Sequence, residues 1–148
     1  MNLRYASKQI TLQEVPNEVS LSYLMTGCPL KCEWCHSESA KDGTKGVELT
    51  PSLLREHIEA TNSLITCVLF LWGEWNEEKL LPLLDVAIEA GMKTALYSWF
   101  EKIDNPIKEK LSYLKVWPYI KELGGLSEST TNQRMYNLRS WEELFLYK

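Results

Sequence analysis

The sequence predicts an α/β protein, an open partial βα barrel built on a mostly parallel sheet. Apolar, β-prone runs alternate along the chain with segments that carry helix signals, and this order is typical of parallel strands joined by right-handed crossovers. The chain has 148 residues, whereas a complete eight-fold barrel takes about 250. It therefore has room for roughly half a barrel, and we expect a single domain over residues 1–148.

The strands are predicted from apolar runs bounded by turn residues. The run Leu64–Leu71 is continuously apolar and β-branched, as expected of a strand buried on both faces. The last apolar run is either a final strand or a docking tail. In chain order the runs are Ile10–Val15 (an edge strand), Val19–Met25, Leu64–Leu71, Met92–Ser98, Leu114–Ile120 and Leu144–Tyr147.

The helices are predicted from their start and stop signals. Thr50 is an N-cap followed by proline, Asn76 precedes a first turn with two glutamates, and Asn105 is again followed by proline. Pro82 is expected to delay or kink the second helix. The expected helices run from Pro51 to about Thr61, from Glu77 to Ala90, and from Asn105 to about Tyr113.

Composition and charge exclude several classes of protein. A net charge of −4 and a pI near 5.3 argue against a general nucleic-acid binder. Apolar runs fall short of the roughly 20 residues that span a membrane, and the first residues do not read as a charged-then-apolar leader. We therefore expect a soluble cytoplasmic protein that binds neither nucleic acid nor membrane.

The segment Cys28–His36 carries the strongest chemical signal in the chain. Cys28, Cys32 and Cys35 have a C-x3-C-x2-C spacing, directly after a predicted strand. The thiols therefore lie on a loop at the carboxyl end of that strand, where α/β proteins place their chemistry. Three thiolates on one loop indicate a metal or an iron–sulfur cluster, and three ligands leave one tetrahedral corner open.

These cysteines have two alternative interpretations. Together with His36 they could make a Cys3His zinc site. Zinc ligands usually come as two separated pairs, and no second C-x2-C or H-x3-H follows in the sequence. Four cysteines in 148 residues are too few for the disulfide framework of a secreted protein.

Two further residues are predicted to be structural. Cys67 lies in the middle of a buried strand and is interpreted as a small hydrophobic core residue. His57 shares the apolar face of the first helix and is interpreted as a packed or partly exposed core histidine.

The cysteine spacing resembles the signature of the radical S-adenosylmethionine enzymes, and in particular their small glycyl-radical-enzyme activases. The resemblance implies that the three cysteines hold three irons of a 4Fe–4S cluster, while S-adenosylmethionine chelates the fourth. An aromatic residue usually precedes the third cysteine in that superfamily, and Trp34 occupies this place. The resemblance also implies that the partial barrel is of the radical S-adenosylmethionine type.

A second motif follows the next predicted strand. Gly73-Glu74 resembles the Gly-Gly-Glu motif that receives the methionine amino group, with Trp72 in place of the first glycine. A glycine lets the backbone approach a ligand closely, and a carboxylate accepts hydrogen bonds from an ammonium group. The alternative is that Glu74 is a solvated residue before a helix. Tyr97-Ser98, at the end of the following strand, is the candidate ribose contact.

The carboxyl-terminal third narrows the resemblance. The segments Tyr119–Gly125 and Thr130–Asn137, together with Glu74–Asn76 and Leu96–Ser98, look like the activating proteins of anaerobic (class III) ribonucleoside-triphosphate reductases. Trp117 stands where that group has glycine.

This resemblance implies a reaction and its partners. S-adenosylmethionine is cleaved by one-electron reduction, and the resulting radical takes a hydrogen atom from a glycine of the large reductase subunit. A flavodoxin-like protein supplies the electron. The alternatives are an activase of another glycyl-radical enzyme, of the pyruvate formate-lyase type, a small radical enzyme acting on a metabolite, and a non-catalytic zinc-binding adaptor.

Overall fold

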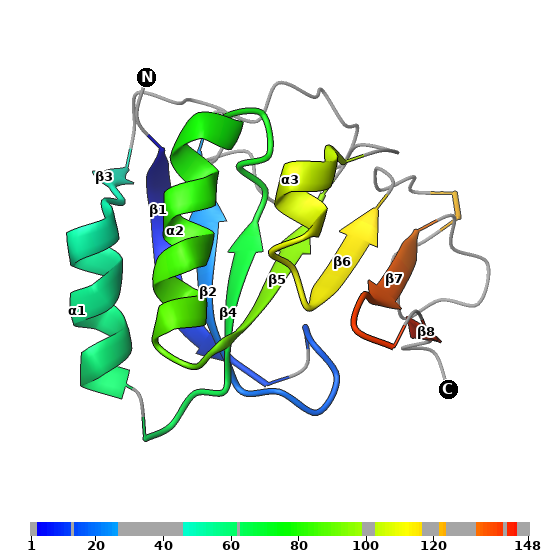
Figure 1. The fold of residues 1–148 in the computed structure, drawn as a ribbon, viewed down its shortest axis with the longest axis horizontal. Coiled ribbons are helices and arrows are strands. Elements are labelled where there is room, and N and C mark those ends of the chain that lie inside the picture. Colours follow the sequence, from blue (N-terminus) through cyan, green and yellow to red (C-terminus); the bar gives the residue numbers. More distant parts are fainter. Residues whose placement is uncertain are drawn as a thin grey trace.

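The structure is a computed structural model, and it describes residues 3–12, 14–26, 46–61, 63–98, 103–116, 122–123, 133–140 and 142–144. Within these residues eight strands form one mixed sheet, and three helices pack on one face of it (Figure 1). The strand order across the sheet is β3-β1-β2-β4-β5-β6-β7-β8.

The described elements alternate between strand and helix in the central part of the chain. Their bounds are β1 (Arg4–Thr11), β2 (Ser20–Met25), β3 (Val47–Glu48), α1 (Pro51–Thr61), β4 (Cys67–Leu71), α2 (Glu77–Glu89), β5 (Lys93–Tyr97), α3 (Asn105–Lys108), β6 (Tyr113–Val116), β7 (Arg134–Asn137) and β8 (Glu142–Leu144).

The centre of the sheet is parallel and its flanks are antiparallel. Strands β2, β4, β5 and β6 pair in parallel, and α2 and α3 connect the last three of them. Strands β1 and β3 on one side, and β7 and β8 on the other, pair antiparallel. The predicted alternation is therefore confirmed, but the parallel arrangement is limited to the four central strands. The open partial barrel stays a prediction.

Strand β4 shows why the centre of the sheet is apolar on both faces. Val68 and Phe70 pack under the helices, while Cys67 and Leu69 belong to a smaller cluster on the opposite face. All four side chains are fully buried, as continuous apolar strands in parallel sheets usually are. We call this second face, on which no described helix packs, the helix-free face. Its buried cluster consists of Val15, Cys67, Leu69, Ala95, Tyr113 and Met135.

Helix α1 has the bounds that its local sequence predicts. The Leu53 amide donates to the Thr50 hydroxyl at 3.1 Å, which is the expected N-cap bond. Leu54 and Ile58 point into the core and are buried. His57 is half-buried, and its Nδ1 lies 2.8 Å from the Tyr23 hydroxyl. The prediction of a packed, partly exposed histidine is confirmed.

The environment of His57 predicts a pH-dependent stability. Burial lowers the pKa of His57 below the ordinary 6.5, and Lys8 adds to this effect against a smaller opposing contribution from Glu56. The unfolded chain therefore binds a proton more readily than the folded protein, so stability is fully present above about pH 6.5 and is lost as the pH falls. We expect the free energy of unfolding, measured by anaerobic urea unfolding, to fall less between about pH 7.5 and pH 5.5 in His57→Gln than in wild type. An equal loss in both proteins would contradict this assignment.

The predictions for two strands and for a delay of the second helix by Pro82 were wrong. The first strand is Arg4–Thr11 rather than Ile10–Val15, and β7 was not predicted as a strand. Pro82 does not delay α2, which begins at Glu77 because the Lys79 and Leu80 amides donate to the Asn76 carbonyl at 3.1 and 2.9 Å.

The third helix is also shorter than predicted, because α3 ends at Lys108. The Ser112 amide already donates to the Thr94 carbonyl at 2.8 Å, so the chain is extended beside β5 before Tyr113 is reached. Pairing with a neighbouring strand has replaced local helix propensity here.

Candidate functional site

The carboxyl ends of the central strands bring the predicted site residues to one edge of the sheet. Leu24 of β2, Leu71 of β4 and Tyr97 of β5 are in register. The residues that directly follow these strands therefore lie at the same edge, as the sequence predicted for the segments Trp72–Glu74 and Tyr97-Ser98.

Glu74 and Ser98 meet at this edge although they come from different βα units. The Ser98 hydroxyl donates to Glu74 Oε1 at 3.0 Å. Ser98 is fully buried, and its amide donates to the Lys115 carbonyl at 2.8 Å. Glu74 is half-buried. A carboxylate has about four lone-pair positions, so the bond from Ser98 leaves Glu74 able to accept from an ammonium group.

The backbone turns sharply between β4 and Glu74. Trp72 has φ 78° and Gly73 has φ 112°, so two consecutive residues adopt left-handed conformations. A Cβ on Gly73 would make only ordinary contact with Met25, at 3.5 Å, so the dihedral angle and not the space favours glycine there.

Trp72 is a strained substitute for a glycine. A bulky residue at positive φ is rare and needs support from its surroundings. Trp72 is buried, with 5% of its surface exposed, and its amide donates to the Tyr97 carbonyl at 2.9 Å. The position where the resembling motif has glycine is thus one whose backbone conformation favours glycine.

Tyr97 lies on the helix-free face, beside a lysine that the sequence analysis did not single out. The Tyr97 hydroxyl donates to the Glu14 carbonyl, which uses its proton. Burial, and to a lesser extent the charge of Glu14, raises the pKa of Tyr97. Lys115 Nζ lies 5.2 Å from the centre of the Tyr97 ring, and only 3% of Lys115 is exposed. A single charged residue within an apolar strand was the signal that could have identified it.

The structure describes the chain up to Thr26, two residues before the cysteine motif. Cys28, Cys32, Cys35 and Trp34 lie outside the described residues. Thr26, which follows β2, is described and buried. Since β2 is the neighbour of β4 in the sheet, the chain that leads to Cys28 departs from the edge that carries Trp72–Glu74.

Cys67 is a core residue, as predicted. It is free and fully buried on the helix-free face. Burial raises the pKa of its thiol to about 12, and this outweighs the lowering effect of a bond with Ser20. Metal ligation requires the thiolate, which is strongly disfavoured at this position.

The opposite edge of the sheet holds a polar cluster around the buried Glu18. Glu18 Oε2 accepts from Lys93 Nζ at 2.9 Å and from the Tyr113 hydroxyl at 3.0 Å. Burial raises the pKa of Glu18, but the bonds from Lys93, Thr66 and Tyr113 outweigh burial and lower it overall. These hydrogen bonds connect the segment before β2 to β5 and β6. In parallel βα folds the amino-terminal edge is generally structural.

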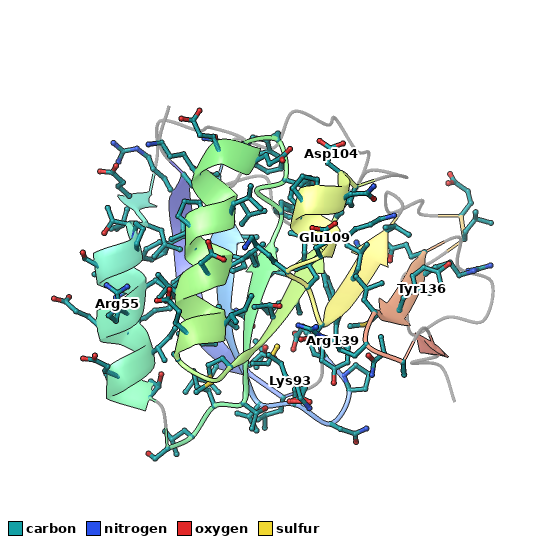
Figure 2. The ribbon with its side chains drawn as sticks, viewed as in Figure 1. Arg55, Lys93, Asp104, Glu109, Tyr136 and Arg139 are labelled. Carbon is teal, nitrogen blue, oxygen red and sulfur yellow. The ribbon has the colours of Figure 1, made fainter. Side chains whose placement is uncertain are left out.

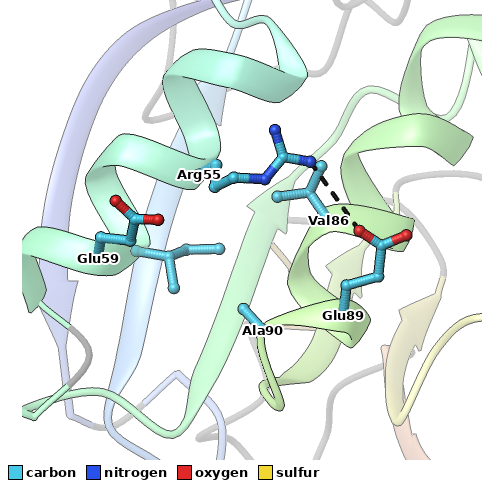
Figure 3. A pocket seen from close by; sticks show the side chains of 6 residues that line it. Arg55, Glu59, Val86, Glu89 and Ala90 are labelled. Atoms are coloured by element: carbon cyan, nitrogen blue, oxygen red, sulfur yellow. Dashed lines mark ion pairs between the residues drawn. The ribbon is translucent and has the colours of Figure 1, made fainter.

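Two cavities in the described part of the chain lie away from the predicted site. One, of about 390 Å³, is a groove between α1 and α2 that is spanned by the Arg55–Glu89 ion pair at 3.9 Å (Figure 3). The other, of about 300 Å³, is lined by residues of the amino-terminal edge that include Lys93 and Arg139 (Figure 2). Neither is lined by Glu74 or Ser98.

None of the described helices is both long enough and apolar enough to cross a membrane.

Comparison with known proteins identifies the family. Residues 18–117 match the family described as a 4Fe-4S single cluster domain. No match was found among curated proteins or among solved structures. The matched range includes Cys28, Cys32 and Cys35 as well as Glu74 and Ser98, and it supports an iron–sulfur cluster over the zinc alternative. Because the match spans most of the chain, from just before β2 to just after β6, this protein belongs to the family of 4Fe-4S single cluster domains.

Proposed function

We propose that this protein is a radical S-adenosylmethionine activase that generates a glycyl radical on an anaerobic ribonucleoside-triphosphate reductase. One observation carries the proposal furthest. Glu74 and Ser98 are joined by a 3.0 Å hydrogen bond at the sheet edge from which the cysteine segment departs. A cluster held by three cysteines has an open coordination position, and this edge offers a carboxylate for the amino group of a ligand bound there.

Each residue of the candidate site has a proposed task. Cys28, Cys32 and Cys35 hold the 4Fe–4S cluster, with Trp34 beside the third ligand. When bound, the cluster would supply the one-electron reduction chemistry needed to cleave S-adenosylmethionine and to activate a glycine of the reductase. This chain binds and orients the cofactor and keeps water away.

Two pairs of residues orient S-adenosylmethionine in this proposal. Glu74 accepts from the methionine ammonium group, and the turn at Gly73 brings the backbone close to it. Ser98 donates to the Glu74 carboxylate and so orients it, and Tyr97 and Ser98 would contact the ribose. Since the Tyr97 hydroxyl donates its hydrogen bond to the Glu14 carbonyl, the hydroxyl oxygen can act toward a ligand only as an acceptor.

The proposed partners rest on the predicted partial barrel. Such a barrel would leave one side of the site uncovered, which suits a substrate that is itself a folded protein. The large reductase subunit would present its glycine there, and a flavodoxin-like protein would supply the electron.

Anaerobic incubation with the candidate reductase tests this function. The cluster-containing protein is mixed with S-adenosylmethionine, a low-potential reductant and the large subunit. We expect a glycyl radical in the electron paramagnetic resonance spectrum that is absent when S-adenosylmethionine is omitted. Cofactor cleavage without a radical on this reductase, but with one on a pyruvate formate-lyase type enzyme, would favour the other activase class. No cofactor cleavage with any partner would contradict radical chemistry.

Trp75 is the described residue best placed for contact with the reductase. It lies past the end of β4 at the site edge and is half-buried, unlike the buried Trp72. Large aromatic side chains often carry the energy of protein interfaces. We expect Trp75→Ala to weaken binding to the reductase by roughly tenfold or more, measured by anaerobic calorimetry, while cofactor cleavage without reductase continues. Leu64→Ala is the control, because Leu64 is an exposed apolar residue that lies before the start of β4, at the opposite edge of the sheet. Equal binding by both variants would contradict a docking role.

A further inference from the structure

The chain leaves the sheet at Thr26 and returns to it at Gly46, and the three cysteines of the motif lie between these residues in the sequence. Arg4, at the start of β1, is hydrogen-bonded to both points, and the carbonyl of its neighbour Tyr5 lies against Gly46. Strand β1 lies between β2 and β3 in the sheet, so it contacts the strand that ends before the cysteines and the strand that begins after them.

The outgoing end is held by two hydrogen bonds to one carbonyl. The Thr26 amide donates to the Arg4 carbonyl at 2.8 Å, and the Thr26 hydroxyl donates to the same oxygen at 3.3 Å. Thr26 is 3% exposed. The last described residue before the cysteine motif is therefore held by a buried contact.

The returning end is held by a hydrogen bond from Arg4 and by strand pairing. Arg4 Nη1 donates to the Gly46 carbonyl at 3.2 Å, and β3 then pairs with Arg4 and Tyr5. Gly46 has φ 91°, and a Cβ there would lie 2.3 Å from the Tyr5 carbonyl oxygen and 3.3 Å from Thr26 Cγ2. Only glycine fits this position without displacing backbone, and it brings the returning chain against the outgoing one.

We propose that Arg4 and Tyr5 form a clamp that positions the cysteine segment for cluster binding, with Gly46 as the residue that lets the clamp close. Ligands that must converge on one cluster lose conformational freedom when they bind it. Fixing both ends of the segment restricts it before the cluster binds, so the entropy cost of binding is smaller. This inference rests on the proposed role of Cys28, Cys32 and Cys35 as cluster ligands. The clamp residues are positioning residues and need no contact with the cluster.

Gly46→Ala, with Gly91→Ala as its matched control, tests the clamp. Gly91 also has a left-handed φ, of 80°, but a Cβ there meets nothing within 4 Å. Both variants carry the same kind of backbone strain, and only Gly46→Ala forces the clamp open. After anaerobic reconstitution we expect several-fold less iron and sulfide in Gly46→Ala and wild-type content in Gly91→Ala, with circular dichroism reporting the fold. Wild-type content in a folded Gly46→Ala would overturn the proposal.

Arg4→Met tests the clamp by a change that keeps the β1 backbone intact. It removes the donor to the Gly46 carbonyl while retaining a long apolar side chain. Arg55→Met is the control, because it removes an ion pair with Glu89 that is exposed and distant from the clamp. We expect iron release to a chelator to be several-fold faster in Arg4→Met than in Arg55→Met. Equal rates would overturn the proposal, even if Gly46→Ala does not fold.

Cys28→Ala separates failure of the clamp from failure of the proposed function. If Cys28→Ala loses its iron while Gly46→Ala and Arg4→Met retain theirs, the clamp is wrong and the ligand assignment stands. If Cys28→Ala also retains its iron, the cysteine assignment itself is wrong, and the clamp proposal, which depends on it, is wrong as well.

Discussion

Replacing Cys28, Cys32 or Cys35 by alanine is expected to abolish cleavage of S-adenosylmethionine in each variant. The three thiolates are proposed to hold the cluster, and a cluster with two protein ligands loses both its anchorage and its single open position. The measurement is iron and sulfide content, together with chromatography of the methionine and 5′-deoxyadenosine released under reducing, anaerobic conditions. Cleavage retained in any one of the three variants would contradict the ligand assignment.

Cys67→Ala is the matched control, because it removes a thiol that the fold has buried. Burial raises the pKa of Cys67 to about 12, so the thiolate needed for iron is disfavoured. We expect wild-type iron content and cleavage, with a loss of about 1 kcal/mol in the free energy of unfolding from the small cavity. A cluster lost in this variant would mean that the fourth cysteine has been misassigned.

Glu74→Gln is expected to weaken S-adenosylmethionine binding without removing the cluster. The amide keeps the shape of the carboxylate and can still accept from Ser98, but it has no charge to offer an ammonium group. Charge-assisted hydrogen bonds contribute about 1.5–3 kcal/mol, so the dissociation constant should rise roughly tenfold to a hundredfold. Anaerobic calorimetry on the cluster-containing variant measures this change.

Two comparisons sharpen the Glu74 experiment. Glu78→Gln removes an equal charge from the exposed first turn of α2 and should leave affinity unchanged. Ser98→Ala removes the 3.0 Å bond that orients the carboxylate, and we expect a smaller loss than in Glu74→Gln. If Glu74→Gln binds S-adenosylmethionine as tightly as wild type does, Glu74 is better interpreted as a solvated residue before a helix.

Local sequence signals were sufficient to predict two kinds of element: a helix stabilised by its own caps and spacing, and a strand that is apolar throughout. Helix α1 begins at Pro51 and ends at Thr61 as predicted, because an N-cap, a first-turn proline and apolar spacing act within the segment itself. Strand β4 was recognised because burial on both faces requires a continuous apolar run. The iron–sulfur class was predicted from three cysteines on one short segment, and the family match confirms it.

Features that depend on distant partners were not predictable in this way. Strand β7 is polar in sequence and becomes a strand by pairing with β6. The predicted third helix gives way to extended chain because Ser112 pairs with Thr94. Gly46 belongs to a segment that is polar in sequence. Position 46 requires glycine because a Cβ there would collide with the Tyr5 carbonyl on another strand.

The sequence by itself determined the α/β alternation of this protein, its core helix and strands, and the cysteine spacing that indicates an iron–sulfur cluster. These properties depend on residues that are close together in the chain. The tertiary structure alone decided that Ser98 supports Glu74, that Lys115 lies over Tyr97, and that Arg4 joins the two ends of the cysteine segment. Each of these contacts joins separate strands, and strand order and register are set by the packing of the whole sheet.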